Sequence, residues 1–216
     1  MQRFKVGEMV IKAGTPILME GSNSPQLYTA LHGMGLKYKF LENGKRQVVN
    51  MVFPGDFVGL QAAMMGEMSY SVEATTHMTL CVFDRSAIWN LIKESPERAF
   101  GITWIAALEE HFLGDALATL GQRNAIQSVA WAMAKLFKRG QALGMVSNNR
   151  MPLPYRQQDL ADALGLSLVH TNKTIAALKN RQIAHWSDGY LSVPDLDALN
   201  DIALLENASP AKRPIF

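Results

Sequence analysis

Two patterns of hydrophobic and polar positions divide the chain near residue 86. Before it, short apolar segments are separated by turn-forming stretches with the letters AGT, EGSNSP, HGMG, ENGK and PGD. Short strands punctuated in this way are typical of an antiparallel sandwich or barrel. The segment GLKYKF-LENGKRQ-VVNMVF predicts a hairpin, because Leu36, Tyr38 and Phe40 alternate and Asn43-Gly44 can take the positive φ angles of a tight turn.

Helical spacing replaces the strand pattern after residue 86, where glycine and proline become rarer. Pro96 can open a helix, and one long helix is predicted from there to Leu120. Its apolar residues recur every three or four positions, at Ile102, Ile105, Leu108, Phe112, Ala116 and Leu120. Such a stripe has to be covered either by the core of its own domain or by the same helix of a second subunit, and the sequence leaves both open. A second helix is predicted from about Arg123 to Arg139.

The segment RQQDLADALGLSLVHTNKTIAALKNRQ, residues 156–182, predicts two short helices broken at Gly165. Gly165 can take the left-handed conformation that ends the first helix, and Ser167 is a natural N-cap for the second. In the second helix Thr171, Ile175 and Leu178 share the inward face, while polar residues lie on the other side of its first turns. This arrangement predicts a helix-turn-helix.

A hairpin is predicted directly after these helices, in IAHWSDGYLSV, with its turn at Asp188-Gly189. A helix-turn-helix followed by such a hairpin is typical of a winged helix, whose second helix enters the major groove of DNA. The alternative is a helical hairpin that only packs, because short helix pairs joined by a glycine are common. The hairpin and the polar first turn favour DNA binding.

Composition limits the function classes without selecting one. The 216 residues are 48% hydrophobic and 19% charged, enough for the core of one large or two small domains. The net charge of +2 permits nucleic-acid binding only through a local basic patch. The single Cys81 rules out an internal disulfide and cannot by itself hold an iron–sulfur cluster or a structural zinc ion. Without a long apolar run or a secretory signal, we expect a cytoplasmic location and no membrane association.

Three segments, in this order, resemble the Crp/Fnr family of bacterial transcription regulators. They are GDFVGL, LGQRNAIQSVAWAMAKL and RQQDLADALGLSLVHTNKTIAALKNRQIA. The resemblance covers about residues 4–200 and implies an α+β fold, with an N-terminal antiparallel β-roll of jelly-roll type, a long dimerisation helix and a C-terminal winged helix-turn-helix. The implied boundaries are residues 1–95 for the sensor β-roll, 96–121 for the dimerisation helix, 122–200 for the DNA-binding domain and 201–216 for a tail.

The segment that would hold an effector departs from the members of the family that bind cyclic AMP. Those members have Glu soon after the glycine of this segment and an Arg-Ser pair at its end, where this chain has Leu60 and Met68-Ser69. A phosphate needs a charge-assisted partner that methionine does not offer, so cyclic AMP is not an expected effector. The alternatives are a protein that needs no effector and one that binds another small molecule in a more apolar site, at Gly59, Leu60, Gln61, Ser69 and Tyr70.

The recognition helix also departs from the best-known members, which carry Arg-Glu at its start and Arg five residues on. Leu168, Val169 and Lys173 stand at those positions. Base reading is then expected from His170, Asn172 and Lys173, with an apolar contact from Leu168 or Val169 to a thymine methyl group. Phosphate contacts are expected from Arg156, Gln157, Ser167 and Thr171. Thr171 alternatively belongs to the core.

Two other function classes are weighed against DNA binding. A cupin-like metal enzyme needs clustered histidines, but His32, His77, His111, His170 and His185 show no close pair. One histidine, such as His77 or His111, could ligate a haem, although a lone histidine is more often a surface or core residue. The other class is a regulatory module that binds a partner protein. We expect no enzyme activity, metal or cofactor; the expected partners are double-stranded DNA, a second copy of the chain, RNA polymerase and an unidentified small-molecule effector.

Overall fold

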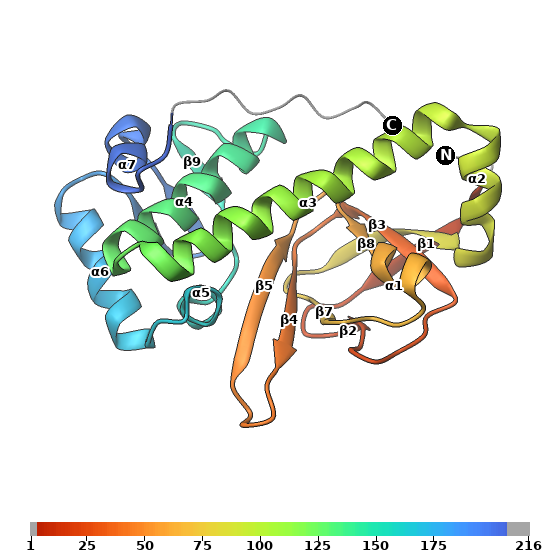
Figure 1. Cartoon of the computed structure of the whole chain (residues 1–216). Helices are drawn as coiled ribbons and strands as arrows, with labels where there is room; N and C mark the ends of the chain where they lie inside the picture. Colours follow the sequence, from red (N-terminus) through yellow and green to blue (C-terminus); the bar gives the residue numbers. More distant parts are fainter. Residues whose placement is uncertain (1–3, 207–216) are drawn as a thin grey trace. The chain divides into compact units, whose positions relative to one another are not determined.

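The computed structural model describes residues 4–206, which form two compact units (Figure 1). One unit comprises residues up to 111 and the other the residues from 112, and the long helix α3, Pro96–Gln122, runs from the first into the second. Antiparallel strands dominate the first unit and helices the second, which confirms the predicted α+β class. Among the described residues, no helix combines the length and the apolar character that crossing a bilayer requires.

Two four-stranded antiparallel sheets form the β-roll of the first unit, with strand orders β1-β8-β3-β6 and β2-β7-β4-β5. The strands are β1 Lys5–Ile11, β2 Pro16–Leu18, β3 Gln26–His32, β4 Gly35–Phe40, β5 Arg46–Val52, β6 Phe57–Val58, β7 Ser71–Ala74 and β8 Met78–Asp84. Inward side chains of both sheets, among them Val72 and Leu80, meet in one buried cluster. The interior of the roll is therefore a packed core.

The predicted hairpin is present as β4 and β5, and its connection is two residues shorter than the LENGKRQ segment set off in the sequence. Its strands pair from Gly35 opposite Val52 to Phe40 opposite Arg46, which leaves residues 41–45 for the connection. Gly44 has a φ of 77°, whereas Asn43 is not in the positive-φ region and uses its side chain to accept a hydrogen bond from the Lys45 N–H at 3.0 Å. The prediction of two positive φ angles at this turn is therefore wrong.

Short helices complete the first unit. Helix α1, Leu60–Met65, follows the turn at Gly59, whose φ is 93°. A Cβ atom on Gly59 would lie 3.1 Å from Leu18 Cδ1, so both the conformation and the space favour glycine. The 3-10 helix η2, Arg85–Ala87, and helix α2, Ile88–Glu94, follow β8.

Helix α3 has two different faces. Ile102 is buried, and the other predicted stripe residues as far as Ala116 are half-buried against their own chain. The Phe112 ring, for example, stacks on Trp131 with a centroid distance of 5.8 Å. A second row is exposed and recurs every three or four residues, at Thr103, Ala106, Glu110, Leu113, Leu117 and Leu120. Most of the predicted stripe is thus covered within the chain, and the unpartnered row lies beside it.

The second unit is built around helix α4, Ala125–Ala142, which begins at a capping box of Asn124 and Gln127. Helices α5, α6 and α7 all pack against α4. They span Gln157–Leu164, Leu168–Asn180 and Leu196–Ile202. A small sheet of order β10-β11-β9 is formed by His185–Ser187, Tyr190–Ser192 and Arg150–Pro152.

Helix α7 was not predicted as an element. The Arg123 side chain fixes its end, because Nε donates to the Ala203 carbonyl at 2.8 Å. The structured part of the second unit thus extends beyond residue 200, where the tail was expected to begin. Residues 207–216 of that expected tail lie outside the described residues.

Candidate nucleic-acid interface

The turn between α5 and α6 is built from the two caps predicted for it. Gly165 ends α5 with φ 64° and ψ 23°, and the Leu166 N–H donates to the Ala161 carbonyl at 3.0 Å. The Ser167 hydroxyl accepts the His170 N–H at 3.2 Å and so caps α6. Both predicted caps are confirmed, and together they set the direction in which α6 leaves α5.

The inner face of α6 holds Thr171, Thr174, Ile175 and Leu178, all buried. The Thr171 hydroxyl donates to the Ser167 carbonyl at 3.1 Å, and Thr174 makes the equivalent bond to the His170 carbonyl at 2.8 Å. Such bonds to the preceding turn allow hydroxyl groups to be buried in a helix. The expectation of a phosphate contact from Thr171 is therefore corrected, since its side chain belongs to the core.

The outer face of α6 is exposed along its first two turns. Val169, His170, Asn172 and Lys173 all lie on it, as the sequence predicted. Ala176, one turn beyond Asn172, is exposed on the same side and was missed. Its spacing of four from Asn172 could have indicated it. A small residue there lets a flat surface approach the helix backbone.

The first residues of α5 lie beside this turn. The Arg156 N–H donates to the buried Asp159 carboxylate at 2.8 Å, and Arg156 Nε lies 3.6 Å from the same oxygen. The Arg156 side chain is nevertheless 74% exposed. Gln157 is half-buried. Arg156 therefore has a fixed backbone and a guanidinium group that can reach a solvent-side partner.

Strands β10 and β11 form the predicted hairpin, which we call the wing, residues 185–192. Ser187 pairs with Tyr190, and the turn residues Asp188 and Gly189 have φ values of 53° and 73°. Arg150, on β9, lies over the Tyr190 ring with its guanidinium carbon 4.0 Å from the ring centroid. This exposed pair was missed, because β9 and β11 are brought together only by the fold.

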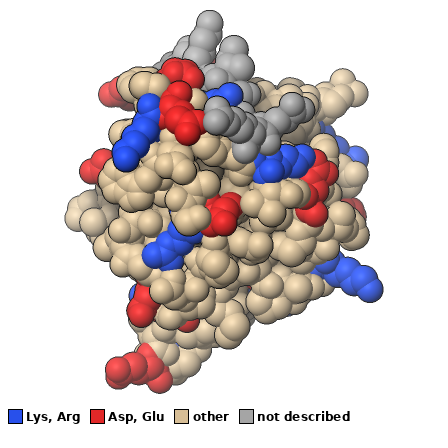
Figure 2. All heavy atoms as spheres, turned by 90° about the vertical axis from the view of Figure 1, so that its right-hand side faces the viewer, with Lys and Arg blue, Asp and Glu red and all other residues tan. Residues whose placement is uncertain are grey.

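Positive charge gathers locally in the segment of residues 150–182. Its five basic residues are all exposed, at Arg150, Arg156, Lys173, Lys179 and Arg181. Its two acidic residues are Asp159, which is buried, and Asp162, which is half-buried. On the face shown in Figure 2, by contrast, acidic and basic side chains are interspersed. Although the net charge of the whole chain is small, residues 150–182 therefore form a locally basic segment of the kind that nucleic-acid binding requires.

The residues expected around an effector contribute to two different packed clusters of the first unit. Leu60 packs with the cluster of Leu27 and Phe57, whereas Tyr70 packs against the separate cluster inside the roll. Gln61 Oε1 accepts the Ser69 N–H at 3.3 Å, which occupies a donor that an anion would need. Met68, at the position of the family's arginine, is buried.

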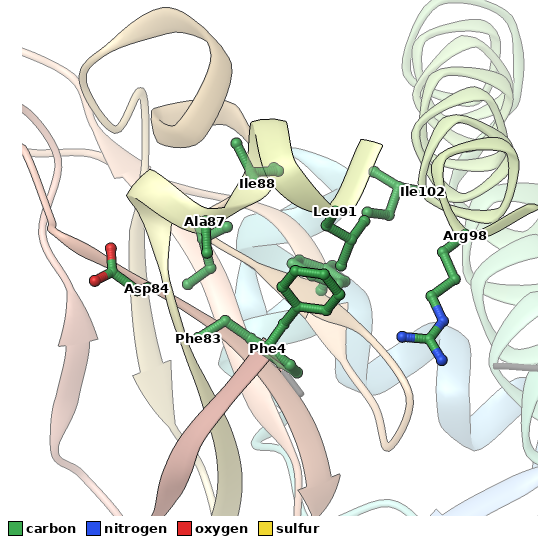
Figure 3. A pocket seen from close by; sticks show the side chains of 10 residues that line it. Phe4, Phe83, Asp84, Ala87, Ile88, Leu91, Arg98 and Ile102 are labelled. Atoms are coloured by element: carbon green, nitrogen blue, oxygen red, sulfur yellow. The ribbon is translucent and has the colours of Figure 1, made fainter. Parts of the chain in front are cut away.

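The pocket in Figure 3 lies elsewhere, between β strands of the roll, α2 and the start of α3. Its lining is almost entirely apolar, with Asp84 and Arg98 as its charged members, and none of the five expected effector residues lines it. Its volume is about 20 Å³, close to that of a single water molecule. A pocket of this size with an apolar lining offers a water molecule few hydrogen-bond partners, so we interpret it as a packing gap. Among residues 4–206, no group of three acidic, histidine or cysteine side chains could hold a metal ion.

Two known domain families match the sequence. Residues 8–95 match the cyclic nucleotide-binding domain, and residues 127–202 match the Crp-like helix-turn-helix domain. These two segments correspond to the β-roll with η2 and α2, and to the second unit from α4 to α7.

Several curated proteins are similar along most of the chain. The nitrogen fixation regulation protein FixK of Bradyrhizobium diazoefficiens is 30% identical over 183 residues, covering 85% of this chain and 76% of FixK. The transcriptional activator protein FnrL of Cereibacter sphaeroides is 26% identical over 171 residues, covering 78% of this chain and 68% of FnrL. Among solved structures, FixK2 from Bradyrhizobium japonicum has a TM-score of 0.81 at 22% identity, covering 95% of this chain and 98% of FixK2. That last likeness concerns the fold alone.

Proposed function

Because the chain belongs to the Crp/Fnr family of bacterial transcription regulators, we propose that it binds a palindromic operator as a homodimer. It is a DNA-binding transcription regulator and not an enzyme. The observation that carries the proposal is the exposed outer face of α6, in a helix-turn-helix whose inner face is buried and which the wing follows.

Base reading is assigned to three exposed residues in the first turns of α6. Asn172 can pair with adenine through two hydrogen bonds, and Lys173 can donate to guanine O6 and N7. His170 supplies a further polar contact, and Val169 can touch a thymine methyl group. Phosphate contacts are assigned to Arg156, Gln157 and Ser167 at the adjoining helix ends.

The exposed row of α3 is the proposed dimer seam, and its occupant is the same row of a second copy. Leu113, Leu117 and Leu120 are 42%, 73% and 46% exposed in the single chain. Together with Thr103, Ala106 and Glu110 they alternate spacings of three and four, which is the heptad pattern of a two-stranded coiled coil. Large apolar residues in such a row are seldom left in water.

We also propose that cyclic AMP is not the effector: the protein either responds to another small molecule or needs no effector. Leu60 and Met68 replace the acid and the arginine that hold the nucleotide in the family members that bind it, and Met68 is buried. RNA polymerase is the proposed protein partner, since the similar FnrL is named a transcriptional activator.

The test is a genome-wide selection of DNA fragments retained by the purified protein, followed by a gel-shift assay on the enriched sequence. We expect a two-fold symmetric motif with half-sites about one helical turn, roughly 34 Å, apart. Cyclic AMP at micromolar concentration should leave the shift unchanged. Selection that enriches no sequence over random fragments contradicts operator binding, and a cyclic-AMP-dependent shift contradicts the effector assignment alone.

A further inference from the structure

A charged side chain lies inside the β-roll, where strands normally contribute apolar residues. Lys37 is 3% exposed and pairs with Val72 on β7. Paired residues of neighbouring strands point to the same face of a sheet, and Val72 belongs to the core cluster inside the roll. The aliphatic stem of Lys37 therefore runs along the inner face of the sheet.

The Lys37 amine has two partners supplied by the chain itself. Its Nζ donates to Glu109 Oε1 on α3, forming an ion pair, and lies 5.3 Å from the centroid of the Tyr70 ring. Burial by itself lowers the pKa of Lys37, but the charge of Glu109 and its hydrogen bond outweigh burial, so the pKa is raised. The amine is thus a cation at every physiological pH.

The neighbourhood of this cation is the part of the domain where an effector was expected. Tyr70, one of the expected residues, faces the Lys37 amine. The adjacent Ser69 N–H is already bound by Gln61. The segment that matches a nucleotide-binding family, residues 8–95, therefore holds a buried positive charge, and its half-buried counter-charge comes from α3 of the same chain.

We propose that the ion pair between Lys37 and Glu109 takes the place of a small-molecule effector, so that the protein binds its operator with no ligand in the β-roll. Lys37 is a positioning residue, because it acts on α3 through Glu109. Within the next two turns the same helix packs on α4, where Asp115 Oδ2 accepts from Lys135 Nζ at 2.6 Å. The inference rests on the proposed function, since it concerns how operator binding is enabled.

The experiment uses the full chain, exhaustively dialysed and examined by native mass spectrometry for bound small molecules. Operator affinity is measured by fluorescence anisotropy for the parent and for Lys37→Met, Glu109→Gln and the double variant. Lys39→Met is the matched control, because Lys39 lies on the same strand and pairs with Glu20 on the surface, with side chains 42% and 37% exposed. A stoichiometric titration of each protein gives the fraction of active molecules.

The parent should bind the operator in its ligand-free state, and a low-mass cell extract should not tighten binding. Lys37→Met and Glu109→Gln should each weaken binding about tenfold, as expected for a coupling between distant parts of a protein. The double variant should be no weaker than the singles, because both remove one interaction. Lys39→Met should stay within about twofold of the parent.

Three results overturn the inference while operator binding stands. They are a parent that binds only after the extract is added, a Lys37→Met variant with the parent's affinity, and variants that lose active molecules but keep the parent's dissociation constant. The last result is what a merely structural role of the ion pair would produce. Glu109→Gln is included because it alters a half-buried group and is therefore less disruptive to folding than a change at the buried Lys37. A parent that binds no selected fragment in any condition instead overturns the proposed function, and this inference with it.

Discussion

Adjacent residues on helix α6 differ sharply in what they can contact. Thr171 is fully buried, with its hydroxyl bonded to the preceding turn, whereas Asn172 and Lys173 next to it are exposed. Substitutions at these neighbouring positions should therefore have different effects. Those at exposed positions should alter DNA binding, and those at Thr171 should alter folding.

Asn172→Ala and Lys173→Ala should each cost about 1–3 kcal/mol of binding to the preferred operator and relax the preference at one base pair of each half-site. The physical reason is the loss of side-chain hydrogen bonds to base edges in the major groove. The measurement is the affinity of each variant for a panel of operators with single-base changes. Variants that keep the full base preference of the parent would refute this assignment.

Arg156→Ala is the comparison for this series, because its exposed guanidinium is assigned to a phosphate. We expect weaker binding to all DNA sequences alike. The slope of the logarithm of affinity against the logarithm of salt concentration should fall by about one unit, since one counterion-releasing contact is lost. A change of base preference instead would place Arg156 among the reading residues.

Local signals allowed single residues to be predicted well when they end or begin helices. Gly165 and Ser167 were assigned correctly because capping depends on backbone conformation within a few residues. Lys37 was not singled out, although it and Lys39 stand on the same strand in GLKYKF. Only Lys37 is buried, and its ion-pair partner Glu109 is distant in the sequence. The strand also has a register shift between Lys37 and Tyr38, which interrupts its alternation.

The turn between α5 and α6 is the element that sets the angle of the recognition helix. Gly165→Ala should lower the free energy of unfolding by about 1–2 kcal/mol, because a Cβ atom disfavours the left-handed conformation observed there. Steric crowding contributes little, since the nearest non-local atom to such a Cβ is Leu120 Cδ2 at 4.0 Å. Urea denaturation followed by circular dichroism measures the change.

Gly165→Asn separates conformation from size at the same position. Asparagine tolerates the left-handed region better than alanine, so this larger residue should destabilise the protein less than alanine does. If asparagine were the more harmful of the two, crowding rather than backbone conformation would govern this turn.

At the level of elements, the sequence allowed the helices to be predicted better than their faces. The long helix was expected at residues 96–121 and lies at Pro96–Gln122. Its apolar periodicity was assigned to one stripe, yet the structure shows a covered face that includes Phe112 and an exposed row that includes Leu117. Periodicity shows which residues share a side of a helix, but the covering partner decides which side is inside.

For the whole molecule, the exposed row of α3 predicts the oligomeric state. Leu113→Glu combined with Leu117→Glu should convert a dimer into a monomer, because facing copies would bring like charges into an apolar seam. Operator affinity should also fall in the monomeric variant, since one molecule would no longer bind two half-sites together. Light scattering coupled to size exclusion, at micromolar concentration, gives the mass.

Trp89→Glu is the matched control, because Trp89 is a large exposed apolar residue on α2, outside the row. This variant should still have the mass of a dimer in the same measurement. A parent protein that is already monomeric at this concentration would exclude the seam, and a monomer produced equally by Trp89→Glu would move the interface to another surface.

The lysine inside the β-roll also has a consequence for how a cell would control this regulator. An effector that is part of the chain cannot be depleted, so a falling metabolite level has no means of releasing the protein from DNA. Control then passes to the number of molecules made and destroyed. Where most subunits are monomeric, the amount of dimer rises with the square of their number, so modest changes in synthesis or proteolysis produce a steep change in operator occupancy.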